Sequence, residues 1–228
     1  MEIYGLQKTT LIDWPGKVAC TAFLGGCDFR CPYCHNSSLM TPQEAGTIPE
    51  EEFFAFLKRR TELLDGVCIT GGEPLLQSGL TEFLKRIKAL GYLVKFDTNG
   101  NHPEKMIGLW EQGLIDYVAM DVKNCLERYA ETAGIIGLNL NPIRKSVAWL
   151  LSGRLEYEFR TTVVKQFHNA EDVIRIGQWL EGANRYYLQS FVPNSAILAT
   201  GLEPWPRTVM ELFQHLIQPY VPAVELRG

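Results

Sequence analysis

The chain has 228 residues, of which 46% are hydrophobic and 21% charged, and its formal net charge is -4. This length suits one sizeable core, so we expect a single domain over residues 1–228. The sequence contains no lysine- or arginine-rich block, no N-terminal signal peptide and no apolar run of about 18 residues. These absences argue against nucleic-acid binding, secretion and membrane insertion, and we expect a cytosolic protein.

Short apolar runs that alternate with longer amphipathic segments predict an α/β fold. A repeated strand–helix order implies a parallel sheet with right-handed crossovers. The sheet can curve into a partial barrel of six βα units with an open mouth, or lie flat, and both forms place ligands at the C-terminal ends of the strands. The predicted strands are Val18–Leu24, Gly66–Thr70, Tyr92–Asp97, Ile115–Asp121, Tyr157–Val164 and Tyr186–Phe191. The predicted helices are Glu51–Leu64, Gly79–Leu90, Pro103–Gly113, Asn141–Gly153, Ala170–Glu181 and Arg207–Leu216.

Three helix starts carry capping signals. Thr47 followed three residues later by Glu50 is typical of a capping box. Ser78 and Asn169 each precede a predicted helix and are candidate N-caps.

Three of the six cysteines, Cys27, Cys31 and Cys34, fall on one short loop after the first predicted strand. The spacing C-x3-C-x2-C allows three thiolates to hold three corners of an iron–sulfur cube. The fourth iron then has no protein ligand nearby and stays open to a substrate, as a chemical role requires. The loop therefore predicts one catalytic [4Fe-4S] cluster.

Two other kinds of site fit these cysteines less well. A structural zinc site needs four ligands; His35 is the available fourth, but it adjoins Cys34 and no second ligand pair follows. Buried, inert thiols are disfavoured because Asp28, Arg30 and His35 make the loop polar.

The segment Cys27–Cys34, with the aromatic Tyr33 before its last cysteine, resembles the signature of the radical S-adenosylmethionine (radical SAM) superfamily. The flanks Leu6–Lys17 and Cys31–Asn36 resemble the branch that activates anaerobic ribonucleoside-triphosphate reductase, to which pyruvate formate-lyase activating enzyme is similar. The resemblance implies reductive cleavage of S-adenosylmethionine to a 5'-deoxyadenosyl radical, which abstracts hydrogen from a glycine of a glycyl-radical enzyme. It also implies a flavodoxin- or ferredoxin-type electron donor, and Tyr33 as a cofactor contact.

Gly71-Gly72-Glu73-Pro74 follows the second predicted strand. Two glycines allow a ligand to approach the backbone closely, although an ordinary strand-to-helix turn has the same composition. The segment resembles the superfamily motif that holds the methionyl amino group. The resemblance therefore makes Gly71, Gly72 and Glu73 candidate cofactor contacts.

Two acidic residues end neighbouring predicted strands, in Asp97-Thr98-Asn99-Gly100 and in Asp121-Val122-Lys123. Two carboxylates close together need a cation or a proton. The resemblance implies a Na+ or K+ site, formed by the side chains of Asp97 and Asp121 and the backbone carbonyls of Thr98 and Met120. It also implies that Lys123 pairs with the cofactor carboxylate, and Asn99 is a further candidate contact. An ordinary Asp–Lys ion pair remains the alternative.

Arg160 lies on the fifth predicted strand, where an inward-facing arginine is costly unless it meets an anion. It is therefore a candidate contact to the cofactor. By resemblance, Val163 is a candidate contact to the adenine. Gln189 is a candidate contact to the ribose, where pyruvate formate-lyase activating enzyme has a histidine.

Two other functions remain open. A radical SAM enzyme of similar size can act on a small molecule, as the 7-carboxy-7-deazaguanine synthases do. A non-enzymatic cluster or zinc protein that serves as a binding or redox module is the other possibility.

Overall fold

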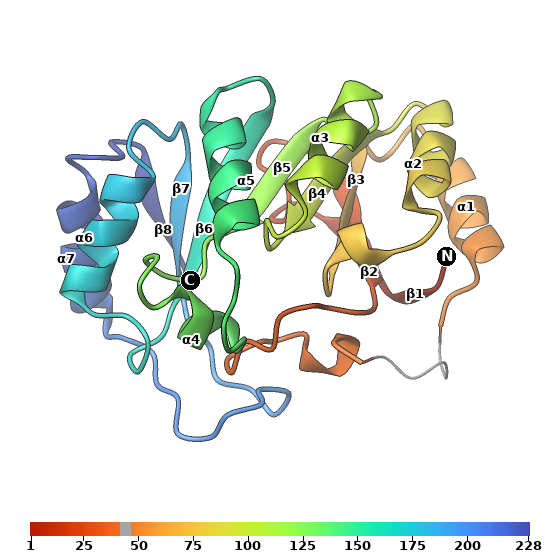
Figure 1. Cartoon of the computed structure of the whole chain (residues 1–228). Helices are drawn as coiled ribbons and strands as arrows, with labels where there is room; N and C mark the ends of the chain where they lie inside the picture. The colour runs from red at the N-terminus through yellow and green to blue at the C-terminus, as the bar shows by residue number, and fades with distance from the viewer. Residues whose placement is uncertain (42–46) are drawn as a thin grey trace. The chain divides into compact units, whose positions relative to one another are not determined.

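The structure is a computed structural model that describes residues 1–41 and 47–228 (Figure 1). The chain forms two compact units. The first contains Met1–Asp28, Ser38–Thr98 and His102–Val118; the second contains Phe29–Ser37, Asn99–Asn101 and Ala119–Gly228. The cysteine loop is shared, because Cys27 belongs to the first unit and Cys31 and Cys34 belong to the second.

The strands of the first unit follow one another in chain order. They are β1 (Ile3–Thr10), β2 (Ala19–Leu24), β3 (Gly66–Gly71) and β4 (Leu93–Thr98). β1 runs antiparallel to β2, whereas β2, β3 and β4 are parallel. The helices α1 (Glu50–Lys58), α2 (Leu80–Ala89) and α3 (Pro103–Glu111) lie on one face of these strands, and the short 3-10 helices η1 (Ser37–Leu39) and η2 (Pro74–Leu76) lie in connections (Figure 1).

Trp14 packs at the N-terminal ends of the first unit's strands. Its buried ring contacts Ala19, Cys68 and Tyr117 in one apolar cluster, and a side chain on Gly66 would collide with it. The segment that carries the resemblance to the reductase-activating branch therefore contributes core packing at the strand ends remote from Gly71 and Asp97.

The second unit contains the end of β5 (Tyr117–Asp121) and the strands β6 (Glu156–Val163), β7 (Tyr186–Ser190) and β8 (Val224–Arg227). β6, β7 and β8 are parallel and follow in chain order. The Val122 N–H donates to the Arg160 carbonyl at 2.8 Å, which places the end of β5 beside β6. The helices are α4 (Tyr129–Ala133), α5 (Asn141–Leu151), α6 (Ala170–Trp179) and α7 (Arg207–Ile217), of which α6 and α7 pack side by side (Figure 1).

The predicted α/β fold is confirmed: all six expected strands form, in a mixed sheet that is mainly parallel and not closed. β1, β8 and α4 were not predicted. β1 exposes Lys8 and Thr9 in its second half, and β8 and α4 are too short for a clear periodic pattern. The first helix is shorter than predicted and ends at Lys58.

Two of the three predicted caps are wrong. Pro49 is the N-cap of α1 and Gly79 is the N-cap of α2, and neither helix start receives a side-chain hydrogen bond. Asn169 does cap α6: its side chain accepts from the Asp172 N–H, and the Asp172 carboxylate accepts from the Asn169 N–H.

Replacing Asn169 with alanine is expected to lower the free energy of unfolding by about 1 kcal/mol, because the Asp172 N–H loses its partner. Urea denaturation measures this. Ser78→Ala is the matched control, since no side chain caps α2 and its stability should not change.

Within residues 1–41 and 47–228, none of the helices combines the length and the apolar character that a membrane crossing requires.

Candidate functional site

The double-glycine turn after β3 is built against the backbone that leads to Cys27. Gly71 has a φ of +117°, and a Cβ on it would overlap the Leu24 backbone. A Cβ on Gly72 would overlap the Gly26 carbonyl and lie 3.4 Å from the Cys27 Cβ. The backbone that lies close to these glycines is therefore the protein's own, at Leu24 and Gly26. This contact fixes the position of Cys27.

The Glu73 carboxylate is fully buried in the first unit. It accepts from the Thr98 hydroxyl, 3.0 Å from both of its oxygens, and from the Leu75 N–H at 3.1 Å. Glu73 therefore joins the C-terminal ends of β3 and β4. These bonds fix the orientation of the carboxylate.

Asp97 has a cationic partner on its own strand. Lys95, two residues earlier, is fully buried, and its ammonium donates to Asp97 Oδ1 at 2.9 Å. A buried ammonium requires such a partner. Lys95 was not singled out from the sequence, although a lysine that alternates with the apolar residues Val94 and Phe96 two positions before an aspartate is a recognisable signal.

The second unit holds Cys31 and Cys34 at the two ends of one tight turn. The Cys34 N–H donates to the Cys31 carbonyl at 3.1 Å. Cys31 is buried and Cys34 is partly exposed. Burial raises the pKa of the Cys34 thiol, and the nearby Lys123 ammonium opposes that rise. A metal that binds this thiol must displace its proton.

Tyr33 lies between these cysteines and is 4% exposed. Its ring packs against Phe167 with the centroids 5.9 Å apart. Its hydroxyl is buried and has no hydrogen-bond partner among the residues that the structure describes. Such a group is rare in native proteins and points to a ligand or a water at this position.

His35 is engaged elsewhere than at Cys34. Its ring stacks on Phe191, and its Nε2 lies 2.8 Å from the Val192 carbonyl. This bond requires a proton on Nε2, which removes that nitrogen from metal binding. A four-ligand zinc site with the His35 Nε2 as its fourth ligand is therefore disfavoured.

Asp121 is held between two cations at the end of β5. The Arg160 Nε donates to Asp121 Oδ1 at 2.9 Å and the Lys123 ammonium donates to Oδ2 at 3.1 Å. Burial opposes ionisation of Asp121, but Arg160 and Lys123 outweigh it and lower the pKa of the carboxyl to about 2. Burial also disfavours the charged form of Lys123, yet Asp121 and Cys31 raise its pKa well above the ordinary value.

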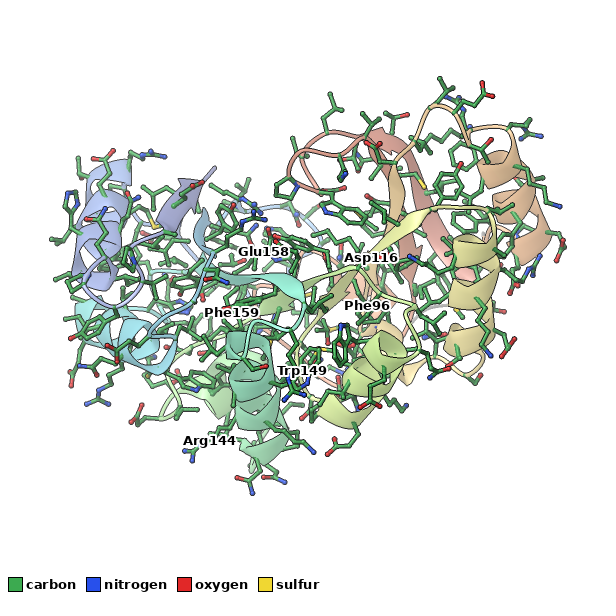
Figure 2. All side chains as sticks on the ribbon, turned by 90° about the horizontal axis from the view of Figure 1, so that it is seen from above. Phe96, Asp116, Arg144, Trp149, Glu158 and Phe159 are labelled. Carbon is green, nitrogen blue, oxygen red and sulfur yellow. The ribbon has the colours of Figure 1, made fainter. Side chains whose placement is uncertain are left out.

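The charges continue from Arg160 of β6 through Glu158, which Figure 2 labels, to Arg227 of β8. Glu158, two residues before Arg160 on β6, is fully buried and lies 4.0 Å from Arg160 Nη1. Arg227 of β8 donates to both Glu158 oxygens, each at 3.2 Å, and stacks over the Tyr187 ring. Lys123, Asp121, Arg160, Glu158 and Arg227, called here the charge ladder, alternate in sign and contain one more cation than anion.

The remaining candidate contacts of the second unit differ in their surroundings. Val163 is buried, and its side chain points to the face of β6 opposite to that of Arg160. Only the Val163 backbone is therefore available to a ligand that lies beside Arg160. Gln189 is partly exposed and pairs in register with Thr162 and Arg227. The Asn99 side chain accepts from the Asn101 N–H at 2.9 Å, and Met120 is buried.

Two further side chains support the Asp121–Lys123 segment and were not predicted. The buried His168 places Nε2 2.9 Å from the Lys123 carbonyl, and its Nδ1 accepts from the Val164 N–H at 3.1 Å. The Tyr129 hydroxyl donates to the Asp121 carbonyl at 3.3 Å. A histidine and a tyrosine that bind only backbone leave no local sequence signal.

The other three cysteines are all buried. Cys20 and Cys68 are buried on strands, as predicted, and burial raises the pKa of each to about 12. Cys125 is also buried, and its thiol donates to Asp172 at 3.5 Å. These thiols stay protonated and unreactive.

Stability is expected to fall as the pH drops below about 6.5, the ordinary pKa of histidine. Burial lowers the pKa of His168, so the unfolded chain takes up this proton before the folded protein does. The stabilisation is complete above the unfolded pKa and is lost as pH falls through the folded one, with a slope of at most about 1.4 kcal/mol per pH unit. Urea denaturation between pH 7 and 5 measures it. The matched variant His168→Gln should lack this component; an unchanged slope would contradict the assignment.

Residues 21–180 match the family model of the radical SAM superfamily. The chain belongs to the radical SAM superfamily. A relative of this radical SAM protein from Methanocaldococcus jannaschii, named for activating a glycyl-radical enzyme, is 36% identical over 200 residues, which cover 85% of this chain and 81% of the relative.

Other proteins resemble this radical SAM enzyme over shorter stretches. Pyruvate formate-lyase-activating enzyme of Clostridium pasteurianum is 33% identical over 54% of this chain and 52% of its own length. A 7-carboxy-7-deazaguanine synthase of Koribacter versatilis is 31% identical over 66% of this chain and 63% of its own length. The crystal structure of SuiB of Streptococcus suis bound to S-adenosylmethionine shares the fold, with a TM-score of 0.70, 13% identity, and 91% of this chain and 52% of that chain covered.

The superfamily implies a [4Fe-4S] cluster and S-adenosylmethionine, and the residues present fit both. Cys27, Cys31 and Cys34 stand on one loop and form no disulfide, and soft sulfur ligands suit iron–sulfur clusters. The buried Tyr33 hydroxyl beside them lacks a partner among the described residues, as expected beside a ligand site.

Proposed function

We propose that this radical SAM enzyme abstracts a hydrogen atom from a glycine of an anaerobic glycyl-radical enzyme, and that its partner is anaerobic ribonucleoside-triphosphate reductase. The proposal takes the whole of residues 1–228 as one radical SAM domain. The M. jannaschii relative supports activation of a glycyl-radical enzyme. The resemblance of Leu6–Lys17 and Cys31–Asn36 to the reductase-activating branch supports the particular partner.

One observation carries the chemical part of the proposal. Within the second unit, the Cys31–Cys34 turn lies in the electrostatic field of Asp121, the last residue of β5, and of Lys123, two residues beyond it. Strand ends of parallel sheets bind ligands. The charge ladder, which begins at this end of β5, has one cation in excess. A cofactor with a carboxylate supplies the missing negative charge.

Each candidate residue then has a defined task. Cys27, Cys31 and Cys34 would hold the [4Fe-4S] cluster, which supplies the electron for reductive cleavage when it is bound. Glu73, oriented by Thr98 and the Leu75 N–H, accepts from the amino group of S-adenosylmethionine.

In the second unit, Lys123 and Arg160 attract the cofactor carboxylate, and the Tyr33 hydroxyl gains a hydrogen-bond partner. The Val163 backbone and the Gln189 side chain would contact adenine and ribose. Gly71, Gly72 and Asn99 complete the proposed cofactor contacts.

A flavodoxin- or ferredoxin-type protein is the proposed electron donor. A Na+ or K+ ion at Asp97, Thr98, Met120 and Asp121 is a further proposal. Lys95 balances the charge of Asp97, and Lys123 and Arg160 balance that of Asp121. A cation would therefore add to neutralised carboxylates, so we expect the rate to change less than twofold when Na+ replaces K+.

The decisive experiment mixes the anaerobically reconstituted, reduced enzyme with S-adenosylmethionine and purified anaerobic ribonucleoside-triphosphate reductase. We expect 5'-deoxyadenosine and a glycyl radical, detected by electron paramagnetic resonance, and neither product from the Cys31→Ala variant. Formation of 5'-deoxyadenosine without a glycyl radical would reject the partner. Absence of both products from the intact enzyme would reject the radical reaction on this substrate.

A small-molecule reaction is the second candidate, favoured by the 31% identity to the K. versatilis 7-carboxy-7-deazaguanine synthase. It predicts that a small molecule, and not a protein, accelerates the formation of 5'-deoxyadenosine.

A further inference from the structure

A histidine precedes α3 in the first unit without capping it. His102 occupies the N-cap position, and its side chain makes no hydrogen bond to the helix start. Serine, threonine, aspartate and asparagine are preferred there, because their short side chains reach the free N–H groups. Pro103 follows at the start of the helix, where its missing N–H needs no partner. The His102 side chain is therefore available for a different contact.

That contact is Asp28 of the cysteine loop. The His102 Nε2 lies 2.9 Å from Asp28 Oδ2, although 74 residues separate the two in the chain. An ionised carboxylate only accepts hydrogen bonds, so Nε2 carries the proton and donates it to this bond. The side chains are 24% and 22% exposed, and partial burial protects such a pair from screening by salt. The bond therefore holds Asp28 at the start of α3.

Asp28 directly follows Cys27, and after it the chain passes from the first unit to the second. On the preceding side, the Glu73 N–H donates to the Gly26 carbonyl at 2.7 Å. The Cys27 N–H donates to the Met40 carbonyl at 3.3 Å. The bond from the histidine to Asp28 adds an attachment on the following side. Within the first unit, Cys27 is therefore held by backbone bonds at and before it and by a side-chain bond after it.

The helix that carries this histidine is itself fixed. Pro103, Met106 and Leu109 of α3 are buried. The Lys105 ammonium donates to the Leu75 carbonyl at 2.8 Å and so connects α3 with η2, which follows the double-glycine turn. The turn that fixes the backbone before the first cysteine is therefore attached to the helix that fixes the residue after it. Supporting bonds of this kind keep a metal ligand in its binding geometry.

We propose that His102 is a positioning residue for the iron–sulfur cluster, and that it acts through Asp28 to hold the Cys27 thiolate where it binds iron. This inference rests on the cluster of the proposed function and is independent of the partner protein. Hydrogen-bonded neighbours that orient metal ligands typically contribute about 10–100-fold to metal affinity. We therefore expect the loss of this bond to weaken the hold of the loop on iron.

The test measures the rate at which the anaerobically reconstituted protein releases iron to an excess of bathophenanthroline. His102→Ala should release iron about tenfold faster than the unmodified protein. His102→Gln should restore most of the difference, because the glutamine amide keeps an N–H that can donate to Asp28. Asp28→Ala removes the same bond from the side of the loop and should also accelerate release about tenfold.

Lys88→Ala is the matched control in the same unit. The Lys88 ammonium lies 2.7 Å from Asp116 Oδ2, and the two side chains are 25% and 29% exposed, close to the values for the histidine–aspartate pair. Asp116 also accepts from the Val94 N–H, which places this pair at the N-terminal end of β4. Its loss does not touch Cys27, so iron release should stay at the unmodified rate. Urea denaturation of the metal-free proteins measures the stability that each variant loses.

The double variant His102→Ala/Asp28→Ala separates a shared action from two independent ones. If His102 acts through Asp28, the double variant should release iron no faster than Asp28→Ala alone. Multiplied effects in the double variant, an unmodified rate in His102→Ala, or no recovery in His102→Gln would overturn the inference. Unmodified protein that bound no iron would reject the cluster and this inference together. The expected rates of iron release without a glycyl radical would support the inference and reject only the proposed partner.

Discussion

Replacing Gly72 with alanine is expected to remove most of the iron that the cysteine loop binds. The added methyl group overlaps the Gly26 carbonyl, which accepts the Glu73 N–H at 2.7 Å, and it presses on Cys27. The clash is with backbone and cannot be relieved by a side-chain rotation. We expect a loss of about 2–3 kcal/mol in unfolding free energy, typical of overpacking, and displacement of the first of the three cysteines. Iron and sulfide analysis after anaerobic reconstitution, together with urea denaturation, measures both effects.

Gly108→Ala is the matched control for this variant. Gly108 lies in α3, and a Cβ there has no neighbour within 4 Å. It should bind iron fully and gain about 0.5–1 kcal/mol of stability, because alanine favours the helix. If Gly72→Ala retained as much iron as Gly108→Ala, the double-glycine turn would not position Cys27.

The apolar strands are the part of the fold that pattern predicts best. β2 to β7 are largely buried, so their sequences are rich in apolar residues, although β4 contains Lys95 and β6 contains Glu158 and Arg160. β1 and β8 lack this signal. β1 contains exposed residues, and β8 has only four residues, of which Glu225 and Arg227 are charged. Their existence depends on pairing with neighbours, which no local pattern encodes.

The candidate site likewise contains residues that a local pattern reveals and residues that only the folded chain brings together. Cys27, Cys31 and Cys34 and the segments ending β3, β4 and β5 could be selected because their residue types are unusual at short spacing. The pairing of Glu158 with Arg227 could not be predicted from the sequence, because 69 residues separate them. Only the register of β6, β7 and β8 brings them together. The sequence singled out Gly71 and Gly72 as candidate site residues. It did not reveal that the backbone of Leu24 and Gly26 is the neighbour that requires glycine at these positions.

Replacing Glu158 with glutamine is expected to destabilise the second unit and to weaken the binding of S-adenosylmethionine. Glu158 is fully buried and is the shared anion between Arg160 and Arg227. Its neutralisation removes the negative charge that lies beside both guanidinium groups. Breaking a buried ion pair costs roughly 3 kcal/mol, here reduced somewhat because Arg227 keeps partial exposure. Urea denaturation should show this loss, and the KM for S-adenosylmethionine should rise because Arg160 loses an anionic neighbour.

Glu156→Gln is the matched control on the same strand. Glu156 is 74% exposed and lies 3.8 Å from Arg185, a surface pair whose loss should change stability by less than about 1 kcal/mol. Equal stabilities of the two variants would show that the buried pair contributes no more than the surface pair.

The double variant Glu158→Gln/Arg227→Gln separates packing from positioning. It removes one anion and one cation together, so the stability lost in Glu158→Gln should be largely recovered, because no cation is left unpaired in the interior. Arg160 still lacks Glu158 in this variant. If the charge ladder orients Arg160 toward Asp121 and the cofactor, the KM for S-adenosylmethionine stays raised while stability returns. If both quantities return together, Glu158 serves only to balance charge, and the direction of Arg160 is set by Asp121 alone.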